Sequence, residues 1–364
     1  MLQKGDSSNL DLLRTVAVLC VLADHLGATF GIAQRHPGFW ALGRWGVLLF
    51  FVHTSLVLMM SMERLGLNGW PMFSTFYIKR FFRIYPLSIA VIILVLAARI
   101  PPTSWPDDIA HPSLSGIISN LFLCQNLTRQ PDLIGPLWSL PYEVQMYLVL
   151  PALFIFVRKC TAGSLAGLWY GAVVVGLLQS WAEGTHHGRL LGFDRFGINK
   201  FTPCFMAGII AYYLLRRRQR AELPFWVWAA TLFTVSWVYV QWNAGAERVG
   251  FPEWLCCLAM GVVVASCVES RYPALNSLTH QIAKYSYGLY LGQVPVLWYA
   301  FVKLKDRSPS LQWCVFLVLI VAGPFAFYHL IEEPFIKLGK MVSTRKRVPA
   351  QFDRSAVTAN IYDK

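Results

Sequence analysis

The chain has 364 residues, of which 56% are apolar and only 14% charged, with a mean hydropathy of +0.48. Soluble domains carry about a quarter charged residues, so this composition excludes an ordinary soluble protein. The net charge of +13 comes largely from short basic clusters between apolar runs, which favours topology signals over nucleic-acid binding. The eight cysteines lie mostly inside apolar runs without a metal-binding spacing, so neither a metal nor a disulfide is expected.

Apolar runs of the length that crosses a bilayer, about 20 residues, recur along the chain. The first run is not a cleavable signal, because it contains Arg14, Asp24 and His25 and no cleavage site follows it. The sequence predicts an all-α polytopic membrane protein with about ten transmembrane helices, at 9–30, 41–62, 84–100, 137–157, 163–181, 198–215, 224–242, 251–268, 281–301 and 311–332. Residues 1–340 form the membrane domain, and residues 341–364 are expected to be a basic, disordered cytoplasmic tail.

A shorter stretch, 114–127, decides the orientation of the chain. It contains polar side chains such as Asn120 and Gln125. If this stretch does not cross, the basic cluster at 216–220 lies on the same side as both termini and most other basic residues. The positive-inside rule therefore favours ten spans in the cell (inner) membrane, with both termini cytoplasmic. We expect 114–127 to be a re-entrant or interfacial segment that lines a cavity.

The first span carries Arg14 and His25, eleven residues apart. Eleven residues are about three helical turns, so the two side chains share a face and lie roughly 16 Å apart along the axis. This places Arg14 near the cytoplasmic surface and His25 in the outer half of the membrane. The alternatives are a snorkelling arginine and a hydrogen-bonded structural histidine.

Two further arginines, Arg80 and Arg83, stand at the entrance to the third span on one helix face. Considered alone, they are explained as positive-inside anchors. They also lie at the predicted depth of Arg14, and three guanidinium groups at one depth suit bidentate recognition of phosphate. The sequence therefore indicates a site for an anionic, phosphate-bearing ligand on the cytosolic side.

The fourth span places Ser139, Glu143 and Tyr147 on one face, just after Trp138. A charged group inside a span costs at least about 2.5 kcal/mol, so Glu143 implies a partner or a function. Glu143 is predicted at the depth of His25. A histidine and a carboxylate at one depth have the form of a general base and the group that orients it.

Three other polar residues lie within predicted spans, namely His53 in the second and Tyr290 and Gln293 in the ninth. They either line the same cavity or form hydrogen bonds between helices. The sequence alone favours hydrogen bonds between helices, which are common among buried polar side chains in membranes.

Together these residues resemble the acyltransferase-3 family of membrane-bound O-acyltransferases, from about Leu10 to Lys337. The family marks here are Arg14 with His25, Arg80 with Arg83, Trp138-Ser139-Leu140 with Glu143 and Tyr147, Ser286-Tyr287-Gly288-Leu289-Tyr290-Leu291, and Glu332-Glu333-Pro334. The chain departs from the family pattern in the second span, where Leu48 replaces an expected acid and His53 is new. Gln293 stands near a position where the family often has histidine. These departures bear on the acceptor and the acyl group.

The resemblance implies transfer of an acyl group, expected to be acetyl, from cytosolic acyl-CoA to a hydroxyl of a carbohydrate or lipid-linked glycan. His25 is expected to be the general base, oriented by Glu143, with the phosphates of CoA on Arg14, Arg80 and Arg83. The residues expected to contact substrate are Trp138, Ser139, Tyr147, His53, Tyr290 and Gln293. Acyl-CoA is a donor substrate rather than a resident cofactor, and membrane lipid is a further partner. A transporter or flippase, or an inactive scaffold, remains as an alternative.

Overall fold

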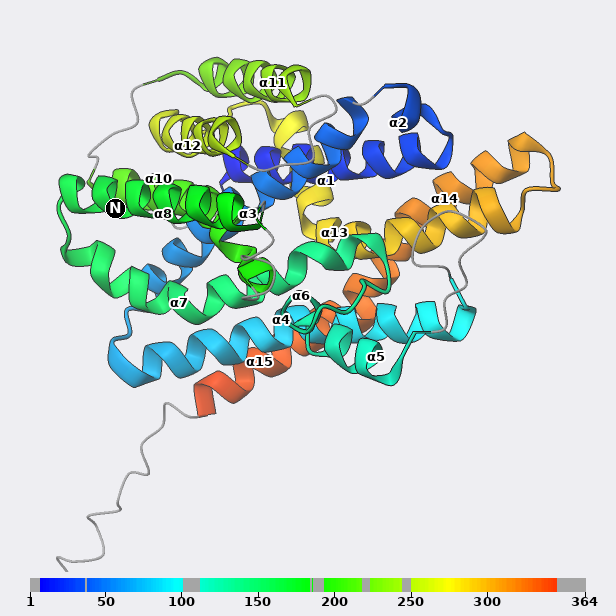
Figure 1. Ribbon diagram of the computed structural model, residues 1–364, viewed down its shortest axis with the longest axis horizontal. Coiled ribbons are helices and arrows are strands. Elements are labelled where there is room, and N and C mark those ends of the chain that lie inside the picture. The colour runs from blue at the N-terminus through cyan, green and yellow to red at the C-terminus, as the bar shows by residue number, and fades with distance from the viewer. Residues whose placement is uncertain are drawn as a thin grey trace, which may run out of the picture.

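The computed structural model describes residues 7–36, 38–100, 112–183, 185, 193–217, 223–243 and 250–345 (Figure 1). Within these residues the regular structure is helical, apart from one isolated bridge between Leu223 and Cys267. The prediction of an all-α protein is therefore confirmed for the described part of the chain. The end of the predicted tail, residues 346–364, lies outside the described residues, whereas 341–345 continue the last helix.

The long helices are α1 (Ser8–Thr29), α3 (Gly38–Leu65), α4 (Gly69–Ala98), α7 (Leu140–Lys159), α8 (Ala162–Glu183), α10 (Ile198–Arg217), α11 (Phe225–Trp242), α12 (Phe251–Ser266), α13 (Pro273–Leu297), α14 (Pro309–Phe327) and α15 (Glu333–Arg345). The short elements are α2 (Ile32–Arg35), α5 (Leu114–Leu121), α6 (Gln125–Thr128), the 3₁₀ helices η1 (Gly135–Ser139) and η2 (Phe193–Phe196), and the π turns η3 (Trp298–Lys303) and η4 (Tyr328–Glu332).

Seven helical segments in the described chain are long and apolar enough to cross a membrane: Ser8–Thr29, Gly38–Leu65, Gly69–Ala98, Gly135–Lys159, Ala162–Glu183, Ile198–Arg217 and Pro309–Thr344. The protein is thus an integral membrane protein, but the predicted count of about ten is not confirmed. The other three predicted spans fall on α11, α12 and α13. Helix α12 has only 16 residues, α11 carries four tryptophans, and α13 carries polar residues such as His280 and Lys284.

The helices of the core pack closely where glycine faces a neighbouring backbone. A Cβ added to Gly46 of α3 would lie 2.4 Å from the Ala17 carbonyl oxygen of α1, and one added to Gly208 of α10 would lie 2.1 Å from that of Val52 in α3. Small residues at such crossings let membrane helices approach each other and gain dispersion energy. Helix α3 is therefore held between α1 and α10, while α15 lies along α4 (Figure 1).

The stretch predicted to be re-entrant or interfacial forms α5 and α6. Helix α5 has 8 residues and is only about 12 Å long, which is too short to cross a hydrocarbon core of about 30 Å. The Asn120 amide donates to the carbonyl oxygens of Gly116 and Pro131, each at 2.9 Å, and its Oδ1 accepts from the Leu133 amide at 3.1 Å. The buried polar groups thus brace the loop that leads into η1, and the stretch lines neither of the two cavities described below.

The hydrogen-bonded loop between α6 and η1 contains an acid whose ionisation should destabilise the fold. Burial raises the pKa of Asp132 to about 6, and a hydrogen bond from Gln125 (2.9 Å) partly opposes the rise. Because the folded-state pKa is above the ordinary value, stability should fall as pH rises from about 4 to 6. Asp132→Asn, which keeps the acceptor, should raise the melting temperature at pH 7 and flatten that pH dependence. Thermal unfolding at pH 4.5 and 7 tests this, and an unchanged melting temperature at pH 7 would contradict it.

Candidate active site

A cavity in the helix bundle gathers most of the predicted site residues. We call it the inner cavity. Its polar lining comes from α1, α3, α4, the η1–α7 segment and α13, and comprises Arg14, His53, Thr54, Arg80, Arg83, Ser139, Glu143, Tyr147, Ser286, Tyr287 and Tyr290. Five elements from different parts of the chain, between Arg14 and Tyr290, therefore meet at one polar, buried site. The predicted convergence of Arg14, Arg80 and Arg83 is present in the structure.

Arg83 is held by an acid from the other end of the chain. Its guanidinium forms an ion pair with Glu332, whose side chain is fully buried. The guanidinium also lies over the Tyr287 ring, 5.6 Å from the ring centroid, and the Tyr287 hydroxyl donates to the Ile84 carbonyl oxygen at 2.9 Å. The ion pair and the aromatic ring fix the position of Arg83 at the cavity wall.

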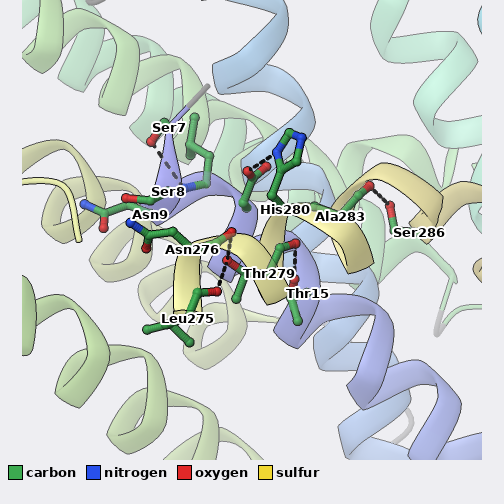
Figure 2. A network of polar contacts seen from close by, with 12 residues as sticks. Ser7, Ser8, Asn9, Thr15, Leu275, Asn276, Thr279, His280, Ala283 and Ser286 are labelled. Carbon is green, nitrogen blue, oxygen red and sulfur yellow. Dashed lines mark hydrogen bonds and ion pairs between the residues drawn. The ribbon is translucent and has the colours of Figure 1, made fainter. Parts of the chain in front are cut away.

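Arg14 is positioned by the contact between α1 and α13. Its Nε donates to the Ser286 hydroxyl, which in turn donates to the Ala283 carbonyl oxygen at 2.7 Å. Figure 2 shows this helix pair, in which the Thr15 hydroxyl also donates to the Thr279 carbonyl oxygen at 3.0 Å. Polar contacts along the pair therefore set where the Arg14 side chain enters the cavity.

Glu143 lies with these cations rather than with His25. It accepts a hydrogen bond from the Tyr147 hydroxyl at 2.6 Å, and the charges of Arg14 and Arg80 act on it. The described residues contain no hydrogen bond between Glu143 and His25. The expected His25–Glu143 pair is therefore not formed in this structure.

The path of η1 explains this difference. A Cβ added to Gly135 would lie 3.6 Å from His25 Nε2, so the start of η1 is level with His25. From Gly135 the chain continues for about 14 Å before Glu143, using rises of about 2.0 Å in a 3₁₀ helix and 1.5 Å in an α-helix. Glu143 therefore reaches the level of Arg14. The preceding Ile134 is fully buried, so this segment is already inside the protein at the point where the sequence predicts the membrane edge.

His25 itself lines neither of the two cavities described here. Gln293 of α13 neighbours its imidazole, but His25 Nδ1 and Gln293 Oε1 have no hydrogen-bond partner among the described residues. The Gln293 amide nitrogen donates to the Tyr290 carbonyl oxygen at 3.1 Å. The imidazole is thus buried beside an amide that has a free acceptor.

Tyr290 connects the His25 region to the inner cavity. Its hydroxyl donates to the Pro136 carbonyl oxygen at 3.0 Å and so accepts from the Ser139 hydroxyl, 2.8 Å away. Ser139 and Tyr290 line the inner cavity, and Pro136, which accepts from Tyr290, follows Gly135 beside His25. Trp138 points elsewhere, packing on Tyr142 and Phe201 with ring centroids 6.2 and 5.8 Å away, and it lines neither described cavity.

A second, larger cavity of about 470 Å³, which we call the outer cavity, adjoins the inner one. Its lining includes Arg14, His53, Val57 and Arg83, all of which also line the inner cavity. It adds the cations Arg64 and Lys284, together with His280, whose Nδ1 lies 2.9 Å from a carboxylate oxygen of Asp11. The two cavities form one route from an open chamber to the buried arginines.

The sequence matches the family model described as an acyltransferase domain, the acyltransferase-3 model, over residues 7–329. The chain belongs to the acyltransferase-3 family. The match covers all five elements that line the inner cavity. The described residues contain no group of three or more His, Cys, Asp or Glu side chains that could hold a metal ion.

Several curated proteins are similar to this acyltransferase-3 chain. Nodulation protein 10 of Rhizobium leguminosarum bv. viciae is 24% identical, covering 94% of this chain and 96% of its own length. The peptidoglycan O-acetyltransferase OatA of Listeria monocytogenes serovar 1/2a is also 24% identical, covering 91% of this chain and 56% of its own length. The acyltransferase MdmB of Streptomyces mycarofaciens is 29% identical over 43% of each chain. No solved structure matches the chain.

Three residues of this acyltransferase-3 site are family marks whose roles the sequence does not show. Ser286 binds Arg14, Tyr287 packs on Arg83, and Glu332 neutralises Arg83. The signal in the sequence was the presence of polar residues inside apolar helices, which implies partners. Their partners could not be identified, because α13 and η4 are distant in sequence from α1 and α4.

Proposed function

We propose that this acyltransferase moves an acetyl group from cytosolic acetyl-CoA to a hydroxyl of a carbohydrate or lipid-linked glycan. The observation that carries the proposal is the convergence of three arginines on one buried cavity that opens into a larger chamber. Two carboxylates, Glu143 and Glu332, accompany the three guanidinium groups, so the group has an excess of one positive charge. Such a site suits a ligand with phosphate groups.

The proposed donor enters from the cytoplasmic side, through the outer cavity. Its phosphates are held by Arg14, Arg80 and Arg83, and its thioester points past Tyr290 toward His25. The acetyl group is favoured because a relative that covers most of this chain is named as an O-acetyltransferase. That relative acts on peptidoglycan, and for this chain the polysaccharide class of acceptor is part of the proposal.

His25 is proposed as the general base. It accepts the proton of the acceptor hydroxyl while the oxygen attacks the thioester carbonyl carbon. The C–S bond then breaks, and the CoA thiolate takes the proton from the imidazolium. Gln293, which lies beside the ring, replaces Glu143 as the proposed orienting residue because its acceptor oxygen has no other described partner. Glu143, bonded to Tyr147, is proposed to balance the charge of the arginines.

Release of free CoA thiol by the purified protein in lipid vesicles, with glycan extract as acceptor, tests the proposal. Arg80 is the arginine to vary, since it makes no ion pair with a described residue, and Glu143, on which its charge acts, keeps the charge of Arg14 and the hydrogen bond from Tyr147. Arg80→Gln should raise the KM for acetyl-CoA at least tenfold, which corresponds to loss of a charged hydrogen bond of roughly 1.5–3 kcal/mol. The exposed Arg35, outside both cavities, provides the control variant Arg35→Gln, which should match the wild type. Absence of thiol release with a broad panel of acyl-CoAs would favour a transporter.

A further inference from the structure

The junction between the inner and outer cavities contains one unusual side chain. Arg14, His53, Val57 and Arg83 line both cavities. The outer cavity holds about 470 Å³ and the inner one only about 80 Å³. By this measure the outer cavity is the larger of the two. A ligand that occupies both cavities therefore has its bulkier part in the outer one and extends a smaller part past these four residues.

His53 has no structural partner to explain its burial. The residue is 5% exposed, and neither ring nitrogen has a hydrogen-bond partner among the described residues; Nδ1 is fully enclosed, so Nε2 is the nitrogen that a ligand in the cavities can reach. The hydrogen bond between helices favoured by the sequence is therefore absent. Buried polar side chains almost always have a partner, from the protein or from water or a ligand. An unsatisfied imidazole on the wall of a junction thus points to a ligand group that passes it.

The chemistry of that group follows from what surrounds it. Arg64 and Lys284 in the outer cavity, with Arg14 and Arg83 at the junction, provide charge for phosphates. A neutral imidazole provides one donor and one acceptor, which suits an amide rather than a phosphate. Acyl-CoA carries both kinds of group in this order, with phosphates on its nucleotide and two amides on the pantetheine arm that ends in the thioester.

We propose that His53 is a specificity residue that hydrogen-bonds an amide of the pantetheine arm as the arm passes from the outer to the inner cavity. The inference rests on the proposed acyl-CoA donor. The nucleotide of the donor then lies in the outer cavity beside Arg64 and Lys284. Its diphosphate extends from there to Arg14, Arg80 and Arg83, and the arm beyond the diphosphate contacts His53.

Two ligands separate the arm from the nucleotide in a binding experiment. Coenzyme A contains both parts, whereas adenosine 3′,5′-bisphosphate contains only the nucleotide end. His53→Phe, which keeps an aromatic ring without hydrogen-bonding groups, should raise the Kd for coenzyme A roughly two- to tenfold, the loss of one hydrogen bond. It should leave the Kd for adenosine 3′,5′-bisphosphate unchanged. His53→Gln, which can bond an amide, should recover most of the affinity for coenzyme A.

Lys284→Ala provides the matched control, since it should weaken the binding of both ligands. Equal weakening of both ligands by His53→Phe would overturn the inference, because a damaged cavity or a contact with the nucleotide has that signature. Unchanged binding of coenzyme A to His53→Phe would overturn it as well. If the wild type bound neither ligand, the donor assignment itself would fail, and that failure is visible before any variant is measured.

Discussion

Replacing His25 by alanine is expected to lower kcat by roughly 10²–10⁴-fold, the usual contribution of a general base. The affinity for acetyl-CoA should remain close to that of the wild type, because His25 lines neither of the two cavities proposed to hold the donor. Initial rates of CoA thiol release, measured together with the Kd for coenzyme A, separate the two quantities. The expected signature is a loss in kcat without a loss in donor binding.

Two variants control for general damage to the protein. His25→Gln retains hydrogen-bonding groups next to Gln293 but cannot act as a base near neutral pH, so it should be as inactive as the alanine variant. His36→Ala removes an exposed histidine outside both cavities and should behave as the wild type. A His25→Ala protein that kept more than about a tenth of the wild-type kcat would contradict the role of His25 as a base, since even the low end of the range is about 100-fold.

Replacing Glu332 by alanine is expected to lower the free energy of unfolding by about 3–5 kcal/mol, the usual effect of breaking a buried ion pair by removing one partner. The Glu332 side chain is fully buried and that of Arg83 is only 22% exposed, so the charge left on Arg83 is poorly solvated. Arg83 would also lose the contact that fixes it at the cavity wall, and donor affinity should fall. Thermal unfolding in detergent and the Kd for coenzyme A test the two effects.

The neighbouring acid and a double variant sharpen this test. Glu333 bonds Lys337, which is 67% exposed, so Glu333→Ala should change the stability little. Glu332→Ala combined with Arg83→Leu removes both charges and should be more stable than Glu332→Ala alone. A double variant that unfolds as easily as the single one would contradict the view that an unpaired Arg83 causes the loss.

The sequence was sufficient to predict the arginine cluster. Arg80 and Arg83 are three residues apart on one helix, and their place at a predicted membrane edge put them level with Arg14. Helical periodicity and charge placement are local properties, and they do not depend on how neighbouring helices are arranged. For this reason the convergence on one cavity could be expected before the packing was known.

The position of Glu143 could not be predicted in the same way. The apolar run from Leu137 predicts a helix that begins at the outer membrane edge. In such a helix Glu143 would lie at the same depth in the membrane as His25. The buried η1 segment shifts that register, so that Gly135 is level with His25 and Glu143 is level with Arg14. Composition does not distinguish a 3₁₀ entry segment inside the protein from the first turn of a spanning helix.

The number of spans shows a similar limit. Helices form at all ten predicted places. Seven segments have the length and hydropathy of a membrane span, whereas α11, α12 and α13 do not. Tryptophans in α11 and polar residues in α13 make these two helices less apolar, and α12 is too short, while packing in the bundle buries residues such as Trp228 and Trp254. A hydropathy pattern predicts that such helices exist, whereas their relation to the membrane depends on their neighbours.

The partners of buried polar residues were the part that the sequence could not supply. The sequence favours a bond from His53 to another helix, yet His53 lines both cavities without a bond from Nδ1 to a described residue. Glu332 was a family mark without a role, and it forms the ion pair with Arg83. These facts depend on how helices cross, and crossings between distant segments are not encoded in local periodicity.

Transfer of a labelled acetyl group tests the central claim most directly. Acetyl-CoA with a radioactive acetyl group would be added to the protein in lipid vesicles together with a panel of glycans and lipid-linked glycans. We predict that the label appears in an alkali-labile glycan ester with the wild type and not with His25→Ala. If no acetyl-CoA were consumed and unmodified glycan crossed the vesicle membrane, the account would be contradicted and the protein would be identified as a transporter.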